Sequence, residues 1–100
     1  MHEPCCNWGV SQHLTPERQR EVKIRFQKIK GQVQGLIKMI DEDRACVDIL
    51  TQIASVSSAL RSVRKIILRN YLETCVKNAI INNQLEIYDE VVEILDKFAK

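Results

Sequence analysis

The sequence is poor in the residues that build large cores and in those that interrupt helices. Aromatic residues make up only 5% of its 100 residues, and it holds three glycines and two prolines. A chain with so little aromatic mass buries a limited core alone, so we expect it to form oligomers. Alternating runs typical of strands are missing, as are repeats and low-complexity tracts. We therefore predict one all-α domain.

Two further absences concern location and chemistry. No apolar run approaches the roughly 20 residues of a membrane span, and the N-terminus lacks the basic-then-apolar order of a signal peptide. We therefore expect a cytoplasmic protein with no membrane partner, whose four cysteines serve as thiols, metal ligands or redox groups. Without a Cys-x-x-Cys, a catalytic histidine near a cysteine or an α/β pattern, an enzyme is not expected.

One long periodic stretch dominates the chain, namely residues 46–75, CVDILTQIASVSSALRSVRKIILRNYLETC. Its apolar residues recur in steps of four and three, the spacing of a helix face that packs on other helices. They are Ile49, Ile53, Val56, Leu60, Val63 and Ile67, and Cys46 extends the row by one step. No glycine or proline interrupts the stretch. We predict a helix that passes Cys75 and ends near residue 81, before Asn82 and Asn83.

The two cysteines of this helix lie near its opposite ends. At about 1.5 Å per residue, Cys46 and Cys75 stand about 43 Å apart, which excludes a bond within one chain. If two copies pack antiparallel and centred near Leu60 and Arg61, Cys46 of one copy lies beside Cys75 of the other. The start of a helix also favours the thiolate form of Cys46. The alternative is that each cysteine is a small core residue.

A second long helix precedes this one. Thr15-Pro16-Glu17 is a typical helix start with Thr15 as N-cap, and the helix runs to about Ile40. Gly31 and Gly35 lie four residues apart in it and indicate the close approach of another backbone. Its apolar row consists of Val22, Phe26, Ile29, Val33, Leu36 and Ile40. Residues 41–44 turn the chain, with Asp43 as the expected N-cap of the long helix.

The two ends of the chain complete the predicted organisation. A shorter acidic helix covers about residues 84–98, begins with a capping box formed by Asn83 and Glu86, and has one apolar face. That face consists of Leu85, Tyr88, Val92 and Leu95. Residues 1–14 show no periodicity, so we predict a flexible arm before a single domain over residues 15–100. The arm is either an incidental tail or a source of accessory metal ligands, which would be His2, Cys5, Cys6 and His13.

Basic residues gather in the middle of the chain. Residues 18–77 hold 13 Lys/Arg against 6 Asp/Glu, whereas residues 78–100 hold 2 against 5. Such a surface suits DNA or another polyanion, although an ordinary solvated surface is the alternative. No standard DNA-binding motif is present, so DNA would bind an assembled surface. The candidate DNA contacts are Arg18, Lys23, Arg25, Lys28, Arg61, Arg64 and Lys65; Arg20, Lys30 and Arg69 lie on the same helices.

Two segments of the chain match the pattern of a known family. They are FQKIKGQVQGLIKMIDEDRACVDILTQIASVSSAL and, later, YLETCV. Over about residues 22–97 the chain resembles the CsoR/RcnR family of bacterial metal- and thiol-sensing repressors. The resemblance implies a three-helix subunit, an antiparallel dimer and a disc-shaped tetramer that releases operator DNA when an inducer binds. It also implies a sensing site that joins one subunit's early cysteine, matched by Cys46, to late residues of the partner's helix, matched by Cys75.

Two departures from the family pattern bear on the inducer and the DNA face. Copper sensors place a histidine four residues before the second cysteine, where this chain has Tyr71, and Ser57 replaces a basic residue of many members. Two cysteines without that histidine resemble the CstR branch, which senses persulfides. Our main hypothesis is a repressor without a cofactor, released when Cys46 and Cys75 of different subunits form a di-, tri- or tetrasulfide. The alternative is a Cu(I) sensor using both thiolates, with or without an arm ligand.

Overall fold

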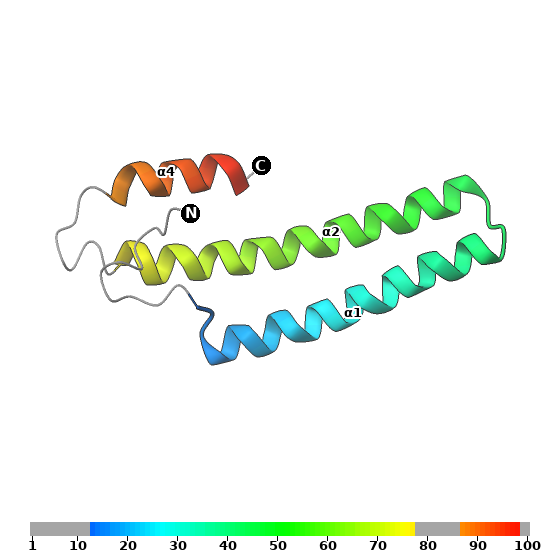
Figure 1. Cartoon of the computed structure of the whole chain (residues 1–100), viewed down its shortest axis with the longest axis horizontal. Helices are drawn as coiled ribbons and strands as arrows, with labels where there is room; N and C mark the ends of the chain where they lie inside the picture. The colour runs from blue at the N-terminus through cyan, green and yellow to red at the C-terminus, as the bar shows by residue number, and fades with distance from the viewer. Residues whose placement is uncertain (1–12, 78–86, 99–100) are drawn as a thin grey trace.

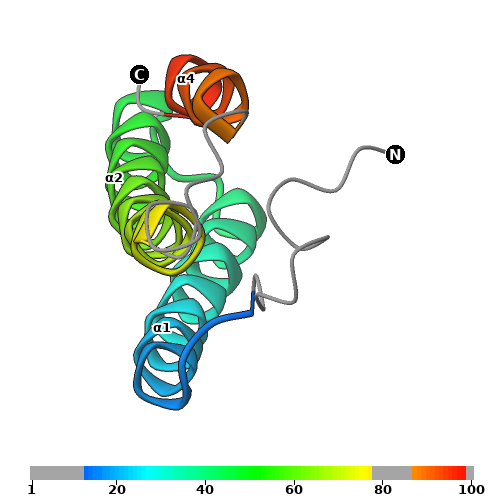
Figure 2. The same ribbon diagram turned by 90° about the vertical axis from the view of Figure 1, so that its left-hand side faces the viewer.

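The computed structural model describes residues 13–77 and 87–98, which form helices and no strands. Helix α1 (Pro16–Asp41) and helix α2 (Cys46–Tyr71) form an antiparallel hairpin, and a π-helical turn, η2 (Leu72–Val76), continues α2. Helix α4 (Ile87–Phe98) lies beside the C-terminal half of α2, on the side away from α1 (Figures 1 and 2). The all-α prediction is confirmed. None of the described helices is long and apolar enough to cross a membrane.

The start of α1 follows the sequence prediction. Thr15 is the N-cap, and its hydroxyl accepts a hydrogen bond from the backbone N–H of Arg18 at 3.3 Å. Pro16 occupies the first turn, where its missing N–H costs no helical hydrogen bond. Glu17 in the same turn suits the positive end of the helix dipole. These local contacts fix where the hairpin begins.

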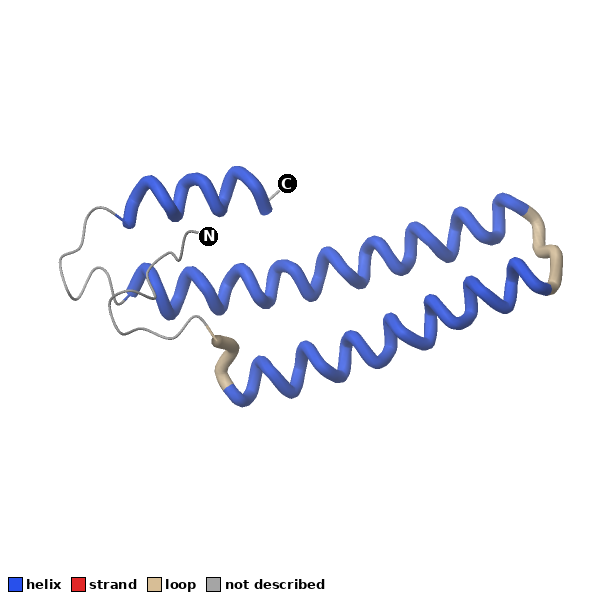
Figure 3. The backbone as a smooth tube through the Cα atoms, in the orientation of Figure 1, coloured by secondary structure: helices blue, strands red, loops and turns tan. Residues whose placement is uncertain are grey.

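The loop between α1 and α2 (Figure 3) differs from the prediction in the residue that caps α2. Asp43 is not the N-cap of α2: Ala45 holds that position, without a side-chain hydrogen bond. Asp43 instead has a φ of 56°, a left-handed conformation that short polar side chains tolerate. Its N–H bonds to the carbonyl of Ile40 at 3.1 Å, so it closes α1 rather than opening α2.

The core between α1 and α2 uses only every second member of the two predicted apolar rows. Val22 and Ile29 of α1 are buried against Val56 and Val63 of α2. Leu36, Ala59 and Ile66 pack partly buried around them. The intervening residues stay about two-fifths or more exposed: Phe26 44%, Val33 42%, Ile40 62%, Ile53 44%, Leu60 45% and Ile67 40%. Each row therefore divides into an inner set seven residues apart and an outer set that the described chain leaves uncovered.

Other predictions meet the structure only in part. A Cβ added at Gly31 or Gly35 would have no described atom within 4 Å, so the expected close approach of a backbone does not occur within the described chain. The predicted third helix is present as α4, with Val92 and Leu95 exposed. Residues 1–12, with His2, Cys5 and Cys6, lie outside the described residues, as do residues 78–86 and hence the predicted end of the long helix.

Candidate sensor site and nucleic-acid interface

Cys46 is the first residue of α2 and carries an exposed free thiol. It stands two helical turns before Ile53, and further steps of seven residues reach Leu60 and Ile67. Residues spaced by seven lie on nearly the same face of a helix. Cys46 therefore belongs to the uncovered outer row of α2.

The other predicted sensor cysteine, Cys75, falls in the π-helical turn that follows Tyr71. A π-turn widens the helix and displaces backbone hydrogen bonds. Here the Thr74 hydroxyl donates to the carbonyl oxygen of Asn70 at 2.8 Å, and also lies 3.3 Å from that of Tyr71. The side chain of Cys75 is outside the described part. Its backbone lies at the opposite end of the α2–η2 rod from Cys46, so the two residues do not meet within one chain (Figure 1).

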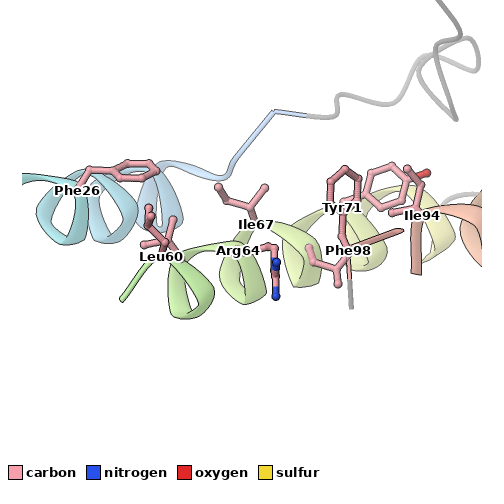
Figure 4. A pocket seen from close by; sticks show the side chains of 9 residues that line it. Phe26, Leu60, Arg64, Ile67, Tyr71, Ile94 and Phe98 are labelled. Carbon is pink, nitrogen blue, oxygen red and sulfur yellow. The ribbon is translucent and has the colours of Figure 1, made fainter. Parts of the chain in front are cut away.

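An apolar groove of about 480 Å³ runs along one side of the hairpin (Figure 4). Its walls come from α1, α2 and α4: Phe26, Leu60, Val63, Arg64, Ile67, Leu68, Tyr71, Ile94 and Phe98. Phe26 and Leu60 lie toward one end, and Tyr71 lies with Ile94 and Phe98 toward the other (Figure 4). The groove thus includes outer-row residues and Tyr71, which holds the position where the family resemblance implies a histidine in copper sensors. Arg64, a predicted DNA contact, also lines it.

At 3.6 residues per turn, Phe26 of the groove lies on one flank of the buried α1 row, and Arg25 and Lys28 lie on the other. The side of the hairpin opposite the groove is therefore basic. One cleft of about 380 Å³ is lined by Arg18, Glu21, Lys65, Ile66 and Arg69. A second, of about 580 Å³, is lined by Glu21, Ile24, Arg25, Lys28, Ile29, Gln32 and Ala59. Glu21 belongs to both clefts and pairs with Arg25 at 3.7 Å. We call these adjoining clefts the basic seam.

The basic seam gathers four of the seven predicted DNA contacts: Arg18, Arg25, Lys28 and Lys65. Lys23 and Arg61 are exposed and line neither cleft. Arg69 joins the seam although the sequence did not single it out, because its place relative to α1 becomes visible only once the hairpin is folded. His13, a predicted accessory ligand, is exposed. Within residues 13–77 and 87–98, no three His, Cys, Asp or Glu residues gather into a metal site.

A buried polar cluster joins the two helix ends beside the basic seam. Asn70, only 1% exposed, donates from Nδ2 to the carbonyl of His13 at 3.2 Å. Its Oδ1 accepts from the backbone N–H of Thr15 at 3.3 Å and from the guanidinium of Arg18 at 3.4 Å. Arg18 also pairs with the carboxylate of Glu73. Asn70 follows Val63 by seven residues and so occupies the inner row; an asparagine in an apolar row was the sequence signal that our prediction missed.

Comparison with known proteins identifies relatives of the whole helical unit. Residues 18–97 match the family described as "Metal-sensitive transcriptional repressor". The copper-sensing transcriptional repressor RicR of Mycobacterium tuberculosis is 48% identical over 56 residues, which span 56% of this chain and 58% of RicR. The copper-sensing transcriptional repressor CsoR of Bacillus subtilis is 34% identical over 89 residues, which span 88% of each chain.

Two solved structures share the fold. Cu(I)-bound CsoR from Geobacillus thermodenitrificans has a TM-score of 0.78 at 34% identity, with 91% of this chain and 96% of that chain covered. The nickel-responsive regulator InrS has a TM-score of 0.73 at 30% identity, with 88% and 96% covered. The predicted family is confirmed, and these relatives match the alternative metal-sensing hypothesis rather than the persulfide branch. The chain belongs to the CsoR/RcnR family of metal-sensitive transcriptional repressors, which are not enzymes.

Proposed function

We propose that this protein represses transcription by binding operator DNA. Cu(I) binds between Cys46 of one chain and Cys75 of another and releases the protein from the DNA. The copper-sensing relatives support the choice of ion. The donor chemistry of this chain also fits, because two thiolates are soft ligands that suit Cu(I). When bound, Cu(I) supplies a soft cation that ties two subunits together. An accessory ligand from the arm, among His2, Cys5, Cys6 and His13, remains part of the proposal.

The observation that carries the proposal is the position of Cys46 on the uncovered outer row. Ile53, Leu60 and Ile67 of that row are 40–45% exposed, which is unfavourable for an isolated chain in water. Two chains that pack antiparallel about Leu60 and Arg61 bury this row against itself. The midpoint of Cys46 and Cys75 falls at the same place, so the pairing that buries the row also brings each Cys46 beside the partner's residue 75.

Tyr71 favours a second candidate effector within the same site. It lines the groove at the position of the copper-sensor histidine, and a phenol is a poorer Cu(I) ligand than an imidazole. A low-molecular-weight persulfide would transfer its outer sulfur to the Cys46 thiolate and leave as a thiol. The Cys75 thiolate of the partner would then attack the inner sulfur of Cys46 and expel hydrosulfide, which leaves an intersubunit disulfide.

The basic seam is the proposed DNA-binding surface. Its lysines and arginines would neutralise phosphates and displace counterions, without inserting a recognition helix. The seam lies across the hairpin from the apolar groove, so pairing through the groove leaves it open to DNA. Two such dimers would form the disc-shaped tetramer that the family resemblance implies.

One experiment separates the two effectors. The wild type is compared with a variant carrying Cys5→Ser and Cys6→Ser, which confines thiol chemistry to the helical unit. Each protein is bound to duplex DNA selected from a random pool. Anaerobic Cu(I) and sodium tetrasulfide are then added separately, while DNA release is followed by fluorescence anisotropy and adducts by intact mass. We expect release by Cu(I) with one copper per site. Release by tetrasulfide alone, with a Cys46–Cys75 crosslink on non-reducing gels, would establish the second candidate instead.

Peptide mapping of the crosslinked product tests the register. Linkage should join Cys46 of one chain to Cys75 of another, and Cys46→Ser should abolish both crosslinking and effector-driven release. A main product that links Cys46 to Cys46, or Cys75 to Cys75, would contradict the antiparallel pairing.

A further inference from the structure

Arg18 stands where the basic seam meets the C-terminal end of α2. We call this end, with the η2 turn that contains Cys75, the sensor end. Its side chain lines the cleft that also holds Lys65 and Arg69. The same guanidinium bonds to Asn70 at 3.4 Å and pairs with Glu73. The cleft also contains the carboxylate of Glu21, which pairs with Arg25. Three cations against this one carboxylate still make a suitable site for a phosphate group. One of the three, however, already holds an internal carboxylate.

The Arg18–Glu73 pair is held in place from several sides. Asn70 is almost fully buried and bonds both to Arg18 and to the backbone at Thr15, so the first turn of α1 is fixed against the end of α2. The Arg18 side chain is only 25% exposed, whereas that of Glu73 is 52% exposed. A half-exposed carboxylate on a positioned arginine is an ion pair that an incoming phosphate can displace at modest cost.

Glu73 also belongs to the sensor end. It lies with Cys75 in the five-residue π-turn Leu72–Val76. A bond formed by Cys75 to metal or sulfur constrains the backbone of this turn, and Glu73 is part of the same backbone. The position of the Glu73 carboxylate is therefore open to control from the sensor site.

We infer that the cleft of Arg18, Lys65 and Arg69 binds one DNA phosphate and that Glu73 competes with that phosphate for Arg18. DNA binding draws Arg18 away from Glu73, whereas a bond at Cys75 holds Glu73 in position and strengthens the competitor. The sensor end thereby weakens one DNA contact directly. This inference rests on the proposed function, and it adds the residue through which release is transmitted.

Substitution of Glu73 by Gln tests the competition, since it removes the charge and keeps the shape. Without effector, Glu73→Gln should bind the selected duplex about two- to fivefold more tightly, the range expected from breaking an exposed ion pair. The slope of log affinity against log salt should stay near the wild-type value, because Arg18 contacts the same phosphate in the complex with or without the Glu73 carboxylate. Glu42→Gln, which removes a carboxylate paired with Lys38 at the far end of α1, controls for net charge.

A double-mutant cycle with Arg18→Gln separates this mechanism from a general charge effect. If Glu73 acts through Arg18, Glu73→Gln has no effect on DNA affinity in the Arg18→Gln background. An equal gain in both backgrounds, or an equal gain in Glu42→Gln, would overturn the inference and leave the proposed function standing. A wild-type protein that binds no duplex would instead overturn both. Circular dichroism checks that all variants keep their helices.

Discussion

Asn70 donates a hydrogen bond to the main-chain carbonyl of His13, 3.2 Å away and 57 positions earlier in the sequence. Within the described part of the chain its side chain makes three hydrogen bonds, to His13, Thr15 and Arg18. Burial of an amide side chain costs free energy unless its polar atoms form hydrogen bonds. In place of apolar packing, Asn70 therefore provides a specific link between two segments. The start of α1 is thereby attached to the last turn of α2, next to the sensor end.

Asn70→Ala should destabilise the folded oligomer by about 1–3 kcal/mol, because it removes these hydrogen bonds and leaves space in the inner row. Urea unfolding at fixed protein concentration measures the change. Gln34→Ala, at an exposed position of α1, should change stability by less than about 0.5 kcal/mol. Equal stability of the two variants would mean that the Asn70 cluster does not stabilise the fold.

Leu60→Glu should dissociate the dimer, since it places a charge at the centre of the proposed pairing. Loss of a buried leucine alone weakens each interface by about 1.5–3 kcal/mol, so the dissociation constant should rise at least about tenfold. Sedimentation velocity across a range of concentrations provides the measurement. Leu50→Glu is the matched control, because Leu50 lies on the same helix, is 63% exposed and is absent from the groove. Dimers of unchanged affinity in Leu60→Glu would place the interface elsewhere.

Tyr71→His should raise Cu(I) affinity. The substitution supplies an imidazole one helical turn before Cys75 and gives the site the Cys-His-Cys set of copper sensors. A gain on the order of tenfold is expected, comparable to the effect of other residues that tune metal sites. Competition with a chromophoric Cu(I) chelator measures it, and Tyr71→Phe separates the new ligand from the lost hydroxyl. Identical affinities in wild type and Tyr71→His would remove Tyr71 from the site.

Arg25→Ala and Lys28→Ala should each weaken DNA binding and lower the salt slope by about one counterion. Both residues line the basic seam. Lys30→Ala removes an equal charge from the same helix at an exposed position outside both clefts. Anisotropy titrations between low and moderate salt compare the three variants. If Lys30→Ala proves as harmful as the others, the binding surface is not confined to the seam.

The helices were predictable because their signals are local. Thr15 and Pro16 define the start of α1 in sequence as they do in space, and the steps of four and three identify both long helices. The period alone, however, does not say which half of each row faces α1 or α2 within a chain. Val56 and Leu60 read alike in sequence, yet the structure buries one and exposes the other.

The remaining features depend on contacts distant in sequence. Asp43 has the composition of an N-cap, but closing α1 required a left-handed residue at that position. Arg18 and Glu73 are 55 positions apart in the sequence, so no local sequence pattern predicts that they pair. The π-turn at residues 72–76 likewise follows a sequence that continues the helical period without a break. The candidate cysteines could be identified from the sequence, whereas the groove and the basic seam could be identified only from the folded chain.

The length of the α2–η2 rod has a consequence for dimers made of two different variants. If each sensor site takes Cys46 from one chain and residue 75 from the other, a dimer holds two sites. A substitution of one cysteine in one chain then affects only one of them. A chain with Cys46→Ser and a chain with Cys75→Ser would each be unresponsive alone. Mixed together, they would form a heterodimer with one site lacking both cysteines and one site fully intact. A heterodimer of two unresponsive chains would thus regain one complete site, which no sensor site built within one chain could do.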